Sequence, residues 1–132
     1  MNTKTTDEIE IQNLVENWAR AVRDKNLTGI LAHHSPDVLM FDVPPPFQSK
    51  GIEAYEKTWD LYFEWGASGV FDICEMNITT GQDVSFVTAS MRCAGVEPDG
   101  VERALDFRLT IGLRKMNGHW TITHEHHSVP AT

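Results

Sequence analysis

The hydrophobic periodicity of the chain changes once, near Val70, and this change limits the folds that the chain can adopt. Before that point apolar residues recur at helical spacing. The clearest stripe is Ile11, Leu14, Val15, Trp18 and Val22. After that point apolar and polar residues alternate, which is the pattern of half-buried β-strands. Helices followed by a run of strands predict an α+β domain with the helices on one face of a mostly antiparallel sheet.

The first half of the chain contains signals for three helices and one strand. Thr5 and Glu8 fit a capping box at the start of the first helix, and Pro36 closes a short second helix over 27–33. A strand at 38–43 stops at three consecutive prolines, which cannot donate hydrogen bonds to a sheet. The third helix follows another stripe at helical spacing: Ile52, Tyr55, Trp59 and Phe63.

The second half predicts four strands, at 71–79, 84–94, 103–115 and 119–127. Turn signals separate them, and Asn117-Gly118 is the strongest because this dipeptide favours a two-residue hairpin turn. We expect a meander that the helices close into a cone, whose open end would suit a ligand. Residues 5–130 would then form one domain, as expected for a chain of 132 residues.

The chain is acidic, with 11 Lys and Arg against 19 Asp and Glu and a net charge of −8. Binding to nucleic acid or to anionic membranes depends on Lys and Arg, so the composition argues against both partners. No apolar run reaches the ~18 residues needed to cross a bilayer, and the first residues lack the apolar core of a secretory signal. We therefore expect a cytoplasmic protein in which Cys74 and Cys93 are buried thiols.

The alternation at 103–115 leaves open which face of that strand is buried. The apolar row could be core and the polar row could meet solvent. Alternatively, the polar row could face a pocket while a second copy of the chain covers the apolar row. The apolar row is Phe107, Leu109, Ile111 and Leu113, and the polar row is Asp106, Arg108 and Thr110.

The last strand has one face that mixes bulky apolar residues with two histidines. A solvent-facing row rarely combines Trp with Ile, so we expect this row to point inward. The row is Trp120, Ile122, His124 and His126. The other histidines are expected at the surface: His33, His34, His119 and His127.

Two parts of the chain resemble known proteins. The pattern that begins at 18–22 and continues through 26–31, 40–42 and 51–59 resembles ketosteroid isomerases. The ending at 118–130, Gly-His-Trp-Thr-Ile-Thr-His-Glu-His-His-Ser-Val-Pro, resembles bacterial SnoaL-like proteins and the association domain of a calmodulin-dependent kinase. The chain is thus similar to SnoaL-like and ketosteroid isomerase-like members of the NTF2-like superfamily. That resemblance implies an NTF2-like cone, with three N-terminal helices on a strongly curved, mostly antiparallel sheet.

The resemblance also implies roles for individual residues. Asp42 stands where the isomerases keep a catalytic base, whereas their two pocket tyrosines fall on Trp18 and Trp59 and their second acid falls on Thr110. The loss of these donors argues against steroid isomerisation itself. If Thr110 is inward, Arg108 is inward too, and the apolar row lies on the convex side. A homodimer would then cover that row: Phe107, Leu109, Ile111 and Leu113.

Asp42, Arg108 and His126 are the candidate catalytic residues of this pocket. An apolar setting would raise the pKa of Asp42 and make it a base, unless it pairs with Arg108 or caps a loop. Arg108, Thr110 and His126 would stabilise an oxygen that gains negative charge. The expected substrate-binding residues are Trp18, Trp59, Thr110, Trp120 and His124.

The histidines of the last strand allow more than one interpretation. His124 and His126 could carry protons, or one of them could bond a backbone carbonyl or Ser128 and hold the strand in place. They could also bind a metal, but no recognised ligand spacing is present, so neither a metal nor a cofactor is expected.

Two classes of function fit these features. The first is an enzyme that binds a small, mostly apolar, carbonyl-containing molecule, with Asp42 as general base for isomerase, cyclase or lyase-like chemistry. The second is a noncatalytic ligand-binding or oligomerisation module, to which the kinase-association resemblance points.

Overall fold

The computed structural model describes residues 5–131, which fold into three helices and one six-stranded sheet. The helices are α1 (Thr6–Arg23), α2 (Leu27–Leu31) and α3 (Ile52–Glu64). The strands are β1 (His34–Phe41), β2 (Ser49–Lys50), β3 (Ala67–Thr79), β4 (Val84–Val96), β5 (Glu102–Met116) and β6 (His119–Ser128). The α+β prediction is confirmed, and only the two-residue strand β2, too short to show a period, was not predicted.

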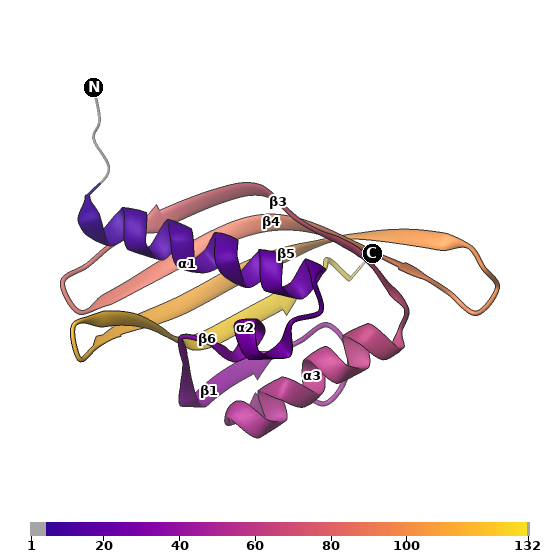
Figure 1. Ribbon diagram of the computed structural model, residues 1–132, viewed down its shortest axis with the longest axis horizontal. Helices are drawn as coiled ribbons and strands as arrows, with labels where there is room; N and C mark the ends of the chain where they lie inside the picture. The colour runs from indigo at the N-terminus through magenta and orange to yellow at the C-terminus, as the bar shows by residue number, and fades with distance from the viewer. Residues whose placement is uncertain (1–4, 132) are drawn as a thin grey trace.

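All three helices lie over the same face of the sheet (Figure 1). The strand order is β2-β1-β6-β5-β4-β3, in which β3 to β6 form the expected antiparallel meander. β1 pairs with β6 in parallel, and Phe41 at its end lies opposite His126. This pairing brings the end of β1 beside the end of β6, although about 85 residues separate them in the chain.

Two of the predicted signals at the ends of elements are confirmed, whereas Pro36 does not close α2, which ends at Leu31, and lies within β1. Thr5 is the N-cap of α1, where its Oγ1 accepts a hydrogen bond from the Glu8 backbone N–H at 3.1 Å. Asn117 and Gly118 have positive φ angles of 54° and 80°, as the tight hairpin turn between β5 and β6 requires. None of the described helices combines the length and apolar character needed to cross a bilayer.

The apolar row of β5 faces the helices and forms part of the core. Each of its four residues is at most 6% exposed, whereas Arg108 and Thr110 on the opposite face are exposed. The helices need an apolar sheet face to pack on, and this row supplies it. The expectation that Thr110 and Arg108 point inward is therefore wrong, and so is a dimer surface built from Phe107, Leu109, Ile111 and Leu113. Whether the protein forms a homodimer stays a prediction.

β6 changes its buried face halfway along. Leu113 of β5 pairs with Ile122, but the preceding Gly112 pairs with His124, so Thr123 is an extra residue in the ladder. Such a β-bulge reverses the alternation beyond it. Trp120 and Ile122 are buried as predicted, whereas the buried residues after the bulge are Glu125 and His127.

The sequence-based orientation of four histidines is wrong, and the bulge accounts for the three that lie on β6. His126 is exposed and His124 is only partly buried, so the prediction that both point inward is wrong. His127, expected at the surface, is buried. The side chain of His34, also expected at the surface, has no exposed area.

The two cysteines are free thiols that differ in exposure. Cys93 on β4 is buried as predicted, but Cys74 on β3 is exposed, contrary to the prediction. Cys74 pairs with no strand residue directly, because the register of β3 against β4 shifts between Ile73 and Glu75.

Candidate functional site

A cavity of about 610 Å³ lies between α3, the end of β1 and strands β3 to β5. Trp65 at the end of α3 packs over Gly95, where a Cβ atom would come within 2.8 Å of the indole ring. No Lys or Arg lines the cavity, whose wall includes the carboxylate of Asp42 and the imidazole of His127. Aromatic rings form much of its wall: Trp59, Tyr62, Trp65, Phe71 and Phe107. This is the arrangement of a site for an apolar molecule with a polar group at one end.

Asp42 follows β1 directly and lies at the polar end of the cavity. Its Oδ1 accepts a hydrogen bond of 2.8 Å from the backbone N–H of Val43. Burial raises the pKa of Asp42, while the nearby imidazole of His127 and the Val43 N–H act in the opposite direction. The direction agrees with the prediction from its apolar surroundings.

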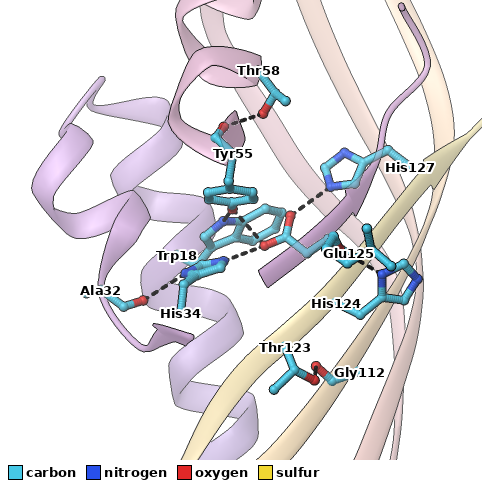
Figure 2. Close-up of polar contacts among 11 residues, drawn as sticks. Trp18, Ala32, His34, Tyr55, Thr58, Gly112, Thr123, His124, Glu125 and His127 are labelled. Carbon is cyan, nitrogen blue, oxygen red and sulfur yellow. Dashed lines mark hydrogen bonds and ion pairs between the residues drawn. The ribbon is translucent and has the colours of Figure 1, made fainter. Parts of the chain in front are cut away.

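Behind the cavity, Glu125 is fully buried at the centre of a hydrogen-bond network (Figure 2). Its Oε2 accepts from the Tyr55 hydroxyl at 2.7 Å and lies 2.5 Å from Nε2 of His34. Its Oε1 lies 2.9 Å from Nε2 of His127. Burial by itself raises the pKa of Glu125, but the hydrogen bonds from His127 and His34 outweigh it and hold that pKa well below its usual range.

His127 connects this network to the cavity. Nε2 is engaged by Glu125, and the ring stacks on Phe107 at 5.4 Å between centroids and 11° between planes. Nδ1 makes no hydrogen bond to any residue within 5–131, although His127 lines the cavity. A carboxylate that holds one imidazole nitrogen while the other faces a site is the arrangement that orients a catalytic histidine.

Tyr55 anchors the network to the helices. The indole N–H of Trp18 donates to its hydroxyl at 3.1 Å, and that hydroxyl donates onward to Glu125. Burial and the charge of Glu125 raise the pKa of Tyr55 well above its usual value, so the phenol stays protonated. The nearby indole N–H of Trp59 acts in the opposite direction and lowers the pKa of Tyr55. That N–H is buried and has no hydrogen-bond partner among the described residues.

Of the predicted pocket residues, Asp42 and Trp59 line the cavity. Trp18 supports it from behind through edge contacts with Trp59 and Phe71. Trp120 is buried elsewhere, and its indole N–H donates to Asp7 at 3.0 Å, which ties β6 to the start of α1.

The remaining predicted residues do not reach the cavity. Arg108, Thr110 and His126 are exposed on the other face of the sheet, so they are not placed to stabilise an oxygen inside it. Arg108 does not pair with Asp106, whose carboxylate instead binds Arg92 at 2.8 Å. His124 donates from Nδ1 to the Leu39 carbonyl at 2.7 Å, which is the strand-holding role that the sequence left open for it.

The sequence interpretation missed His34, Tyr55, Glu125 and His127 as site residues. Tyr55 stood in the apolar stripe of α3, where nothing distinguished it from a core residue. A β-bulge in the last strand would have been the signal for Glu125 and His127. One extra residue before them turns their side chains from the outer face of the sheet to the inner face. His34 had no local signal, since its partner lies 91 residues away in the chain.

The cluster is not arranged as a metal site. Among residues 5–131, no group of three or more His, Cys, Asp or Glu side chains is placed to hold an ion. Both imidazoles instead direct Nε2 at the Glu125 carboxylate. Proton transfer is the chemistry that these side chains can perform themselves.

A mixed sheet with helices over one face and an apolar cavity between them defines an NTF2-like protein. The chain belongs to the SnoaL-like domain family, whose family model matches residues 11–132. No curated protein sequence matches the chain. The family and the superfamily are those that the sequence resemblance indicated.

Solved structures agree with this assignment. An NTF2-like protein of unknown function from Pseudomonas putida KT2440 is 31% identical, with 98% of this chain and 90% of that one covered and a TM-score of 0.84. A ketosteroid isomerase-like protein from Erwinia carotovora atroseptica is 16% identical, with 98% and 100% covered and a TM-score of 0.79. A putative calcium/calmodulin dependent protein kinase II association domain from Xanthomonas campestris is 16% identical, with 93% and 88% covered and a TM-score of 0.77. The last two likenesses concern the fold alone.

Proposed function

We propose that this protein is a cofactor-independent enzyme that moves a proton on a small, mostly apolar, carbonyl-containing molecule. Asp42 and His127 would be the proton-transfer pair. One observation carries the proposal: an aromatic cavity of about 610 Å³ contains a carboxylate with a raised pKa and an imidazole whose Nδ1 is unblocked. Perturbed ionisable groups in an apolar cleft are typical of catalytic sites.

The wall of the cavity favours a neutral substrate with a ring. Trp59, Tyr62 and Phe107 offer faces and edges against which a flat apolar molecule packs. A carboxylate or phosphate group on the substrate would meet Asp42 with no Lys or Arg to pair with. The polar end of the substrate is therefore an uncharged group, for which a carbonyl oxygen suits an imidazole donor.

The reaction begins with Asp42 as the base. Its carboxylate removes a proton from the carbon beside the carbonyl, and the C–H electron pair moves toward the carbonyl oxygen. His127 donates from Nδ1 to that oxygen and stabilises the negative charge, in place of the exposed Arg108. Because Nε2 already contacts Glu125, this donor is the doubly protonated ring, which a neutral resting His127 becomes by taking up a proton from water. Return of the proton to another carbon gives an isomerase, whereas departure of a leaving group gives a lyase.

The experiment is deuterium exchange beside the carbonyl of 1-tetralone, a flat apolar ketone, followed by NMR in D₂O. The protein should accelerate the exchange, and Asp42→Asn should lower the acceleration on the order of 100-fold or more. The asparagine can still accept the hydrogen bond from Val43, so the variant should fold. Asp60→Asn is the matched control, because Asp60 is an exposed carboxylate on α3 outside the cavity. Undiminished exchange by Asp42→Asn would contradict the base assignment.

The second candidate is a noncatalytic ligand-binding or oligomerisation module. The ending of the chain at 118–130, which resembles the association domain of a calmodulin-dependent kinase, favours it. Quenching of the cavity tryptophans by 1-tetralone, without any exchange of its protons, would support this function over the enzyme. Trp59 and Trp65 both line the cavity and would report that binding.

A further inference from the structure

The hydrogen bonds of His34 determine how many protons its ring can carry. Nδ1 lies 3.0 Å from the carbonyl oxygen of Ala32, which can only accept, so Nδ1 carries a proton. Nε2 lies 2.5 Å from Oε2 of Glu125. If Glu125 is ionised, its oxygens can only accept as well, and His34 must then be doubly protonated.

The surroundings of Glu125 favour its ionised form. The Tyr55 hydroxyl donates to Oε2, while Nε2 of His34 lies within hydrogen-bond distance of Oε2 and Nε2 of His127 within that distance of Oε1. Three hydrogen bonds to a carboxylate stabilise its charge. Glu125 and His34 have no exposed side-chain area, so the charge needs a counter-ion within the protein.

Two imidazoles could serve as that counter-ion, and their other contacts differ. His34 uses both nitrogens on protein acceptors, which requires the positive form. His127 uses Nε2 alone, and one proton on that nitrogen is enough for its contact with Glu125. The geometry therefore satisfies every hydrogen bond with His34 charged and His127 neutral.

We propose that the imidazolium of His34 is the resident counter-ion of Glu125, and that His34 is thereby a positioning residue that keeps His127 neutral, with Nδ1 open toward the cavity. The effect on catalysis rests on the proposed function, whereas the assignment of protons does not. Without His34, the negative charge of Glu125 would fall to His127, which would become a fixed cation and would release its proton less readily.

The ionisable groups around both rings are few. Glu125 on β6 and Tyr55 on α3 contact His34, and the phenol stays neutral. His127 meets Glu125 on its own strand and Asp42 after β1, while Cys93 on β4 and Tyr62 on α3 also line the cavity. Burial raises the pKa of Cys93 to about 11 and also raises that of Tyr62, so Glu125 and Asp42 alone among these groups bring negative charge to His127 at neutral pH.

NMR of the whole protein labelled with ¹⁵N-histidine tests the proposal, because ring ¹⁵N shifts separate the two neutral tautomers from the cation. At pH 7.5 the wild-type spectrum should show His34 doubly protonated and His127 neutral with its proton on Nε2. In His34→Gln the amide can still donate to Glu125 but carries no charge. The titration midpoint of His127 should then rise by at least one pH unit, a tenfold change in proton affinity.

The outcomes separate this inference from the proposed function. A neutral His34 beside a charged His127 in the wild type overturns it, and so does an unchanged midpoint of His127 in a folded His34→Gln. If that variant does not fold, the wild-type spectrum still decides which ring is charged. His119→Gln, an exposed histidine of the same strand, is the control and should leave the midpoint of His127 unchanged. Failure of 1-tetralone exchange would affect only the catalytic role and not these proton positions.

Discussion

Glu125 shows at the scale of one residue how a buried charge is tolerated. Its side chain has no exposed area, yet each carboxylate oxygen has at least one donor at hydrogen-bond distance. The partners offset the cost of removing this charge from water, whereas loss of one partner leaves the others with unmet hydrogen bonds. The network therefore couples the core to the site, because the same carboxylate orients His127.

Glu125→Gln should lower the free energy of unfolding by about 3–5 kcal/mol, since it leaves the His34 charge buried without its counter-ion. The pKa of Glu125 is lower in the folded protein than in the unfolded chain. Its stabilisation is therefore complete above the unfolded pKa and is lost as the pH falls through the folded one. Urea denaturation from pH 7 down to pH 3 should show a shallower loss for Glu125→Gln than for the wild type.

The matched control for that measurement is Glu53→Gln, at an exposed position in the first turn of α3. It should change stability by less than about 0.5 kcal/mol, as exposed substitutions usually do. Equal stability of Glu125→Gln and wild type at pH 7 would mean that the carboxylate is not ionised in the folded protein.

At the scale of one element, the bulge in β6 decides which side chains reach the core. Ile122 and Glu125 are both buried although three positions separate them, an odd offset that a regular strand would place on opposite faces. The extra residue Thr123 makes this possible, and its Oγ1 donates to the Gly112 carbonyl at 3.3 Å. The one-residue bulge thus places His127, and not His126, on the inner face of the sheet beside the cavity.

Deletion of Thr123 should abolish cooperative folding. The shortened strand would have to turn either Trp120 and Ile122 or Glu125 and His127 away from the core, and each choice costs several kcal/mol of burial or pairing. Thr123→Ala is the control, because it keeps the length of the strand and loses one long hydrogen bond. A cooperative thermal transition of the deletion variant, at the wild-type temperature, would show that the strand accommodates a regular ladder.

At the scale of the whole molecule, the cavity lies where the sheet face is not filled by the helices that pack on it. α1 packs on β3 and α3 packs against β1, and both meet the same sheet face (Figure 1). Between them aromatic rings contact one another mainly by their edges, as Trp59 does with Trp18 and Phe71. The cavity is bounded by elements from both halves of the chain, so its chemistry requires the complete fold.

A neutral ligand should bind this cavity at least ten times more tightly than an anion of similar shape. The pair to compare is 1-tetralone and 1-naphthoate at pH 7.5, followed through the fluorescence of Trp59 and Trp65. The carboxylate of Asp42 disfavours the anion, and no cation lines the cavity to compensate. Asp42→Asn should reduce this preference, and tighter binding of 1-naphthoate to the wild type would contradict the predicted neutral substrate.

Much of the fold follows from local patterns. The positions of the helices and long strands, the cap at Thr5 and the turn at Asn117 depend on neighbours within a few residues, so the sequence predicts them. For β5, the alternation allowed the correct interpretation, in which the apolar row is core. The transfer of residue roles from the isomerases instead placed Thr110 and Arg108 inward, which is wrong. Asp42 was predicted for the site because an apolar strand end and the family resemblance agreed.

The rest of the site was decided by contacts between distant parts of the chain. His34 reaches Glu125 only because β1 lies parallel to β6, and Glu125 and His127 face inward only because Thr123 is accommodated in the ladder. Neither the pairing of distant strands nor the position of a bulge is determined by residues close together in the sequence. A periodic pattern of apolar residues therefore does not predict them. Both are selected by the free energy of burying the whole core at once, which exists only in the folded molecule.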